Sequence, residues 1–343
     1  MSHSKDYNWY TSNKWTELSS DDKWYTQITH ITALPHHPLE FPTLPAPLRV
    51  VASACKDSIL SMLNSDTNGE ILILPQYPEI IKRITRIYRK KHIMSPAGVL
   101  IDGQPGIGKS VLVCYLLFVL LSLKDEKDPH TKLCSAPVFL YTRDLILFYD
   151  GKIYKPKEPT TFHLQDLPTP LKDRVNLTRK PPVWVLVDLE GEARDPLNLL
   201  EAVPANVFIV YSSSPNPAHY AKRWVENRRP LAVGLPLWTR KLLIRGWDLQ
   251  AAQQLLSRRI LSWARRVPSD HGSLPKEHRA VLKEDLPRAD WAQMTDNEII
   301  SRATGLLIGE AIFRYGKVAR DIYFYLQSPA QLNKSHKDHD TNK

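Results

Sequence analysis

The chain has 343 residues, of which 43% are hydrophobic and 9% aromatic, so it is too apolar to be wholly disordered and suits one large or two modest domains. Forty-six Lys and Arg residues against 36 Asp and Glu give a formal net charge of +10, which favours polyanionic partners such as nucleotides, nucleic acid or an acidic membrane surface. Three well-separated cysteines, without a C-x-x-C pair, predict neither a zinc site nor a disulfide framework and favour an intracellular location, cytoplasmic or nuclear. The longest apolar run, Val111–Leu123, is shorter than the roughly 20 residues of a membrane-spanning helix, so no membrane segment is predicted.

The N-terminal region differs in composition from the rest of the chain. Residues 1–47 are predicted to form an irregular arm, because tryptophans and tyrosines are scattered among polar residues and prolines punctuate the second half. Tryptophans in such an arm usually dock on the domain behind them, although a partner-binding role is the alternative. An ordered core is expected to begin at residue 48, with a strand at Ile71–Leu74.

An amphipathic helix is expected from Pro78 to Lys91. Its apolar side carries Ile80, Ile84, Ile87 and Tyr88. Its other side carries Lys82, Arg83, Arg86, Arg89 and Lys90. This basic face is either simply solvated or contacts nucleic acid.

The next segment matches the phosphate-binding P-loop pattern G-x-x-x-x-G-K-[ST]. The matching residues are Gly103, Gln104, Pro105, Gly106, Ile107, Gly108, Lys109 and Ser110. A short buried strand is predicted before them, at Val99–Asp102, and a buried helix after them, at Val111–Leu123, which is the context that the motif needs. Backbone N–H groups and Lys109 would hold nucleotide phosphates there, and the Ser110 hydroxyl would bind Mg²⁺.

Further apolar segments predict an α/β core, a mainly parallel sheet flanked by helices, over residues 48–237. The predicted strands are Pro137–Tyr141, Leu145–Tyr149, Ile153–Tyr154, Val183–Val187 and Val207–Tyr211. Asp150-Gly151 between the second and third of these is a strong hairpin signal.

Polar residues at the ends of two of these strands are candidates for catalysis. Asp188 ends one strand and would hold Mg²⁺ at the same crevice as the P-loop. Many P-loop ATPases place Glu directly after this acid to orient the attacking water; here Leu189 follows, and then Glu190, which either serves instead or belongs to an exposed loop. Ser212 and Ser213 end the other strand and either sense the γ-phosphate or form an ordinary Ser-Pro loop.

Residues 238–327 are predicted to form a C-terminal helical lid, followed by a mobile tail at 328–343. Within the lid, 268–290 is expected to be a loop, and Thr295 with Glu298 forms a predicted capping box. An arginine could neutralise charge during phosphoryl transfer. The candidates are Arg320, from the lid, and Arg223, Arg228 and Arg229, presented to a neighbouring subunit of a homo-oligomer; each is equally explained as a surface charge.

Together these segments resemble Crinkler and retrotransposon-hotspot-like NTPases. The resemblance covers roughly residues 70–325. It rests on Gly103–Ser110 with the apolar helix behind it, Asp188, Ser212–Pro215, Leu235–Thr239 and Tyr315–Arg320. It implies an AAA+/STAND-type ATPase core with a helical lid, specificity for ATP, and action in the nucleus.

The sequence therefore predicts an intracellular P-loop NTPase that binds ATP and Mg²⁺ and hydrolyses ATP to drive a conformational change. Three alternatives remain at this stage. The chain could be a nucleotide-gated switch that barely hydrolyses ATP, a nucleic-acid-handling module that uses the basic helix face, or a small-molecule or nucleoside kinase.

Overall fold

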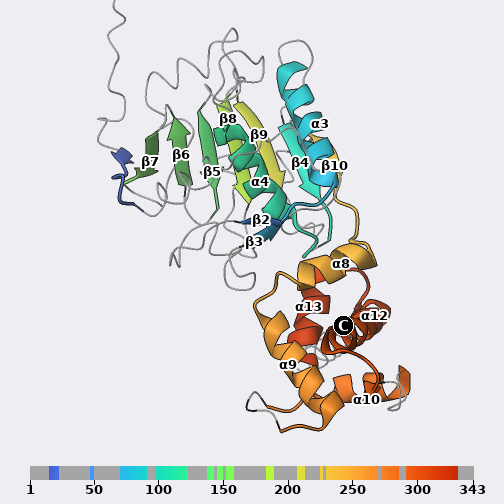
Figure 1. Ribbon diagram of the computed structural model, residues 1–343. Helices are drawn as coiled ribbons and strands as arrows, with labels where there is room; N and C mark the ends of the chain where they lie inside the picture. Colours follow the sequence, from blue (N-terminus) through green and yellow to red (C-terminus); the bar gives the residue numbers. More distant parts are fainter. Residues whose placement is uncertain are drawn as a thin grey trace, which may run out of the picture.

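The computed structural model describes residues 15–22, 47–49, 70–90, 98–104, 106–122, 137–142, 145–149, 152–157, 183–188, 207–212, 225–226, 229–268, 270, 272–285 and 291–330. These residues form one part built on a β-sheet and a second part built of helices, called the helical layer below (Figure 1). In this view the helical layer lies below the sheet. No helix in the described ranges is long and apolar enough to cross a lipid bilayer.

The main sheet has eight strands in the order β1-β7-β6-β5-β8-β9-β4-β10. Their bounds are β1 Trp15–Glu17, β4 Gly98–Asp102, β5 Val138–Tyr141, β6 Leu145–Tyr149, β7 Lys152–Pro156, β8 Val183–Asp188, β9 Val207–Ser212 and β10 Leu231–Gly234. Strands β5, β8, β9, β4 and β10 are neighbours in this order and pair in parallel. Strands β6, β7 and β1 extend the sheet from β5 with antiparallel pairing. The prediction of a mainly parallel sheet therefore holds for one part only, because short connections such as 150–151 can join only antiparallel neighbours. A separate two-stranded sheet pairs β2 (Pro47–Arg49) with β3 (Glu70–Leu72), so the strand expected at 71–74 ends two residues early.

The parallel strands and two helices make the core of the sheet layer. Every residue of β8 and β9 is buried, as expected of strands covered on both faces. Helix α4 (Lys109–Ser122) packs on both strands and is buried from residue 112 to 120, which confirms the predicted buried helix. Helix α3 (Gln76–Lys90) confirms the predicted amphipathic helix and packs on β4, with the Tyr88 ring stacked 4.2 Å from the Trp184 ring.

The predicted irregular arm contains one strand of the sheet. Residues 15–17 form β1, which pairs with β7 at the outer edge. Trp15 is 3% exposed and its ring lies 6.2 Å from that of Phe139, while Glu17 forms an ion pair of 3.1 Å with Lys152. The prediction of irregular structure is therefore wrong at residues 15–17, whereas the prediction that an arm tryptophan docks on the domain is confirmed for Trp15.

The helical layer consists of the helices from α8 to α13, below the sheet in Figure 1. Their bounds are α8 Arg240–Trp247, α9 Ala252–Arg265, α10 Lys276–Asp285, α12 Asp296–Tyr315 and α13 Ala319–Gln327. The capping box of Thr295 and Glu298 is confirmed at the start of α12. The prediction of a loop at 268–290 is wrong at 276–285, where the chain forms α10. The sequence did not reveal this helix because few of its residues are apolar. Its buried residues His278, Val281 and Leu282 recur at helical spacing among charged ones.

His278 is a buried titratable side chain of the helical layer. Its side chain is fully buried, and Nε2 lies 3.1 Å from the carbonyl oxygen of Tyr325 on α13. Burial lowers the pKa of His278 to about 4, against the opposing effects of the Tyr325 carbonyl and of Glu277. The layer therefore holds this imidazole in its neutral form at neutral pH.

The free energy of unfolding is expected to fall as the pH drops from about 6.5 to about 4. In that window the unfolded chain binds a proton that the folded chain excludes, which costs about 3 kcal/mol in total. Urea unfolding of the wild type and of His278→Gln across this range measures the effect. The variant should show the shallower pH dependence, and parallel profiles for the two proteins would contradict this account.

Candidate functional site

The parallel register brings several predicted site residues to one edge of the sheet. Asp188 at the end of β8 pairs with Ser212 at the end of β9, and Ser212 pairs with Ile101 of β4. Asp102, the last residue of β4, pairs with Gly234 of β10. Because parallel strands end at the same edge, the acid, the serine and the loop that comes after β4 share one neighbourhood.

The loop between β4 and α4 has three glycines with positive φ. Gly103, Gly106 and Gly108 have φ angles of +145°, +78° and +96°, which side-chain-bearing residues rarely adopt. Space is also restricted there. A Cβ atom on Gly106 would lie 2.6 Å from the Cβ of Arg320, and one on Gly108 would collide with the hydroxyl of Tyr77.

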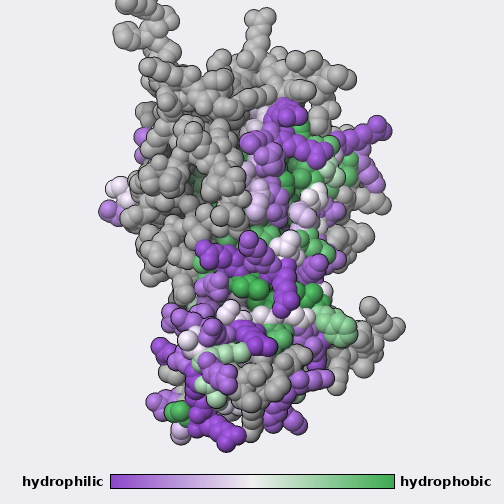
Figure 2. Space-filling view, turned by 45° about the vertical axis from the view of Figure 1, so that its right-hand side comes forward, coloured by the Kyte–Doolittle hydropathy of each residue, from purple (hydrophilic) through white to green (hydrophobic). Residues whose placement is uncertain are grey.

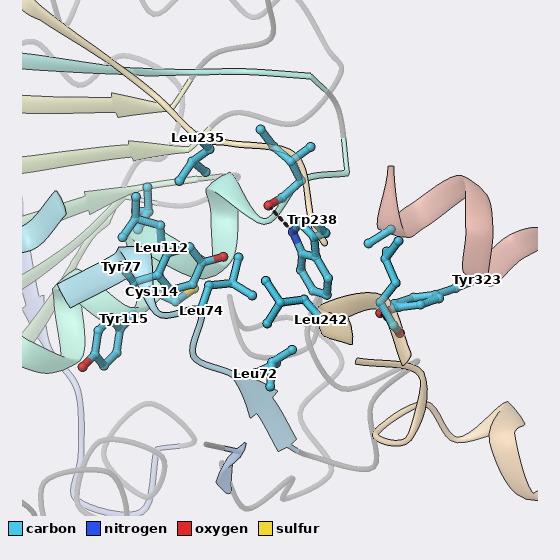
Figure 3. Packing of buried hydrophobic residues seen from close by; sticks show 14 of the residues in the cluster. Leu72, Leu74, Tyr77, Leu112, Cys114, Tyr115, Leu235, Trp238, Leu242 and Tyr323 are labelled. Carbon is cyan, nitrogen blue, oxygen red and sulfur yellow. Dashed lines mark hydrogen bonds between the residues drawn. The ribbon is translucent and has the colours of Figure 1, made fainter. Parts of the chain in front are cut away.

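Two side chains from outside the loop hold consecutive loop carbonyls. The Trp238 indole Nε1 donates to the carbonyl oxygen of Ile107 at 2.9 Å, as Figure 3 shows, and the Tyr77 hydroxyl donates to that of Gly108 at 2.7 Å. In a trans peptide the C=O of one residue and the N–H of the next point in opposite directions. The N–H groups of Gly108 and Lys109 are therefore turned away from Trp238 and Tyr77, at the start of α4 where helix N–H groups lack intrahelical partners.

The Lys109 ammonium lies over the beginning of the loop. It donates to the carbonyl oxygens of Gly103 at 2.5 Å and Gln104 at 2.9 Å. Partial burial lowers the pKa of Lys109, and the carboxylates of Asp102 and Asp188 oppose this shift. The positive charge of Arg320 acts in the same direction as burial. The charges of Asp102, Asp188 and Arg320 are thus close enough to act on the Lys109 ammonium.

Asp102 is a site residue that sequence reasoning missed. Its Oδ1 accepts a hydrogen bond of 2.7 Å from the N–H of Gly103, which fixes the turn from strand into loop. Its position as the last strand residue before the first glycine was the available signal. Tyr77 and Trp238 were also missed, because they lie 31 and 131 residues from the carbonyls that they bind and no local pattern reveals such contacts.

The oxygen donors at the site fit Mg²⁺ only together with further ligands. Asp188 is 4% exposed, and Ser110 is half-buried in the first turn of α4. Carboxylate and hydroxyl oxygens suit this hard cation. Within the described ranges no group of three His, Cys, Asp or Glu residues could hold a metal ion alone. Such a donor set matches the usual mode of Mg²⁺ binding, in which one or two protein oxygens are supplemented by substrate phosphates and water.

Arg320 approaches the loop from the helical layer. It lies in the first turn of α13, where its own Cβ and the buried Val318 side chain pack against Gly106. Its side chain is 65% exposed, and Nε lies 3.4 Å from Asp321 Oδ1. The guanidinium is therefore accessible beside the loop.

Other predicted residues lie elsewhere. Arg229 is exposed just before β10, at the opposite end of that strand from the loop. Six candidates or their neighbours lie outside the described residues: Pro105, Leu189, Glu190, Ser213, Arg223 and Arg228.

The basic face of α3 is exposed at the described positions. In the upper right part of Figure 2, hydrophilic side chains lie on the surface together with apolar patches. Lys82 pairs with Glu79 at 2.9 Å, and Arg83 and Arg86 are exposed. Side chains of Arg89 and Lys90 lie outside the described ones. Exposed basic side chains of this kind are expected both of a solvated helix face and of one that contacts nucleic acid, so both alternatives stay open.

Comparisons with known proteins give limited likenesses. No protein-family model matches the chain, and no curated protein does. Among solved structures, that of C. elegans PCH-2 is similar over 76% of this chain and 69% of its own, with 14% identity and a TM-score of 0.31. That of Drosophila ORC bound to DNA is similar over 80% of this chain and 70% of its own, with 10% identity and a TM-score of 0.33. With TM-scores this low, the character of the site rests on its own geometry.

Replacing Gly106 by alanine should destabilise the chain more than replacing Gly316. The two glycines have nearly the same φ, +78° and +75°, but only Gly106 faces neighbouring atoms, since a Cβ on Gly316 would meet nothing within 4 Å. Both variants incur backbone strain of about 1–3 kcal/mol, at Gly316 because its φ of +75° and ψ of −169° are essentially confined to glycine, and Gly106→Ala must also displace the start of α13. Chemical denaturation of both variants measures the difference. Equal losses in the free energy of unfolding would contradict the close packing of α13 against Gly106.

Proposed function

We propose that this chain is a P-loop NTPase that binds ATP with Mg²⁺ at the loop between β4 and α4 and hydrolyses it. One observation carries the proposal: three glycines with positive φ form a loop whose N–H groups at Gly108 and Lys109 are oriented by hydrogen bonds from outside. A loop of this kind at a helix N-terminus is suited to phosphate. The choice of ATP over another nucleotide rests on the family resemblance.

In this proposal each loop residue acts through a specific atom. The backbone N–H groups of Gly106–Ser110 would bind the phosphate oxygens, while Gly103, Gln104 and Pro105 shape the start of the loop. The Lys109 ammonium would exchange the carbonyls of Gly103 and Gln104 for the β- and γ-phosphates. Gln104, Pro105 and Ile107 contribute backbone rather than side-chain chemistry. Arg320 adds a second positive charge from the helical layer.

Metal binding falls to Ser110 and Asp188. The Ser110 hydroxyl would hold Mg²⁺ directly, and the buried Asp188 carboxylate would hold it at the strand edge, usually through water. When bound, the ion neutralises charge on the β- and γ-phosphate oxygens. Ser212, beside Asp188 in the register, would contact the γ-phosphate, with Ser213 as the adjacent candidate.

Hydrolysis requires a group that orients the attacking water. We assign this role to Glu190, two residues after Asp188. Hydrolysis would then alter the contacts of the helical layer with the loop and drive the conformational change. The competing function is a switch that binds ATP without turnover, and the presence of Leu189 directly after the acid favours it.

Lys109→Ala should weaken nucleotide binding by about 10- to 100-fold, because it removes charge-assisted hydrogen bonds to phosphate. Lys317→Ala, at an exposed lysine of the helical layer, is the matched control and should bind as the wild type does. Calorimetric titration with ATP and Mg²⁺ measures both. Unaltered affinity in Lys109→Ala would refute the proposed site.

Glu190→Gln separates an ATPase from a switch. If Glu190 orients the water, steady-state phosphate release should fall to background in the variant while ATP affinity is retained. A wild-type protein that binds ATP but releases no phosphate would instead establish the switch.

A further inference from the structure

Trp238 lies between the phosphate loop and the helical layer. It comes after β10, just before α8, and is 8% exposed. Its Nε1 donates to the Ile107 carbonyl, and its ring lies 3.8 Å from the position that a Cβ on Gly108 would occupy. One side of this residue is therefore committed to the loop.

The same ring is packed into the helical layer on its other side. A Cβ on Gly246 of α8 would lie 2.7 Å from its Cζ3, so the ring is seated directly against the backbone of that helix. Its centroid lies 6.3 Å from that of Tyr323 on α13, in an edge-to-face arrangement. The Tyr323 hydroxyl in turn donates to the Leu243 carbonyl of α8 at 2.9 Å, so Tyr323 ties α13 to α8 beside Trp238 (Figure 3).

We propose that Trp238 is a positioning residue that couples nucleotide binding to docking of the helical layer. This inference rests on the proposed function, since it assumes that the loop binds a nucleotide. The indole hydrogen bond orients the Ile107–Gly108 peptide only while the ring is seated against Gly246 and Tyr323. Movement of α8 and α13 away from the loop removes that donor and releases an N–H group of the phosphate cradle.

A second contact links the same two parts of the chain. Val318 and Arg320, around the start of α13, pack on Gly106 close to the peptide that Trp238 orients. In Figure 2, patches of apolar surface lie at the level where the two layers meet. Coupling of this kind is reciprocal: if docking strengthens nucleotide binding, the nucleotide strengthens docking by the same factor.

Hydrogen exchange of the full chain tests the coupling without any substitution. Adenylyl imidodiphosphate with Mg²⁺ should slow exchange of backbone amides in α8 and in the first turns of α13, and leave those of α10 unchanged. Absence of added protection in α8 and α13, under conditions where the nucleotide is bound, would overturn the inference.

Trp238→Phe then removes the N–H donor and keeps an aromatic ring. Its affinity for the same nucleotide should fall by about fivefold to tenfold, as expected for one lost hydrogen bond, and protection of α8 and α13 by the nucleotide should be lost. The control is Trp263→Phe, at a partly buried tryptophan of α9 that packs on Trp291 at 5.5 Å. It should retain both the affinity and the protection.

These results distinguish failure of the coupling from failure of the nucleotide site. If the wild type binds nucleotide and Lys109→Ala does not, but Trp238→Phe retains full affinity and full protection, only the coupling is refuted. If Lys109→Ala binds as tightly as the wild type, the proposed function itself fails. Loss of protection in Trp263→Phe as well would mean that general loosening of the helical layer, and not Trp238, accounts for the effect.

Discussion

Two hydrogen bonds, from Tyr77 to Gly108 and from Trp238 to Ile107, fix the peptides on which the candidate site depends. A glycine-rich loop has many accessible conformations, and its own short sequence cannot select one of them. Selection comes instead from α3, which precedes the loop, and from the segment between β10 and α8. The conformation of the candidate site therefore depends on three segments that are separated in the sequence, and its helical neighbours are structural parts of it.

The order of the strands separates the site from the rest of the sheet. Strands β8, β9, β4 and β10 are consecutive, and the polar residues at their ends converge. The antiparallel strands β6, β7 and β1 continue the sheet on the other side of β5. Their side chains Trp15, Leu147 and Tyr154 pack with Phe139 and with residues of β8 and β9 in a second hydrophobic cluster. This extension continues the sheet at one edge, while the parallel part positions the residues of the candidate site.

Local patterns in the sequence predicted the elements and part of the site. The valine-rich run at 183–187, the Asp-Gly hairpin and the capping box at Thr295 are short-range signals, and each corresponds to what the chain forms. Helix α10 and strand β1 were not predicted, because each buries only a few residues and is stabilised by partners that are distant in the sequence. The roles of Tyr77 and Trp238 were not predicted for the same reason. Their hydrogen bonds span 31 and 131 residues, and such contacts do not affect the local periodicity of the sequence.

The charges around Lys109 constrain what the site can bind. Asp102 and Asp188 offset the positive charges of Lys109 and Arg320, so the site has little excess positive charge of its own. A triphosphate brings several negative charges beside those two carboxylates, and bare nucleotide would be repelled by them. In the proposed function, Ser110 and Asp188 would hold a divalent cation that supplies positive charge beside the phosphates and offsets this repulsion. If the proposed function holds, the buried acid would favour the nucleotide–metal complex over the free nucleotide, and that complex is the form used in phosphoryl transfer.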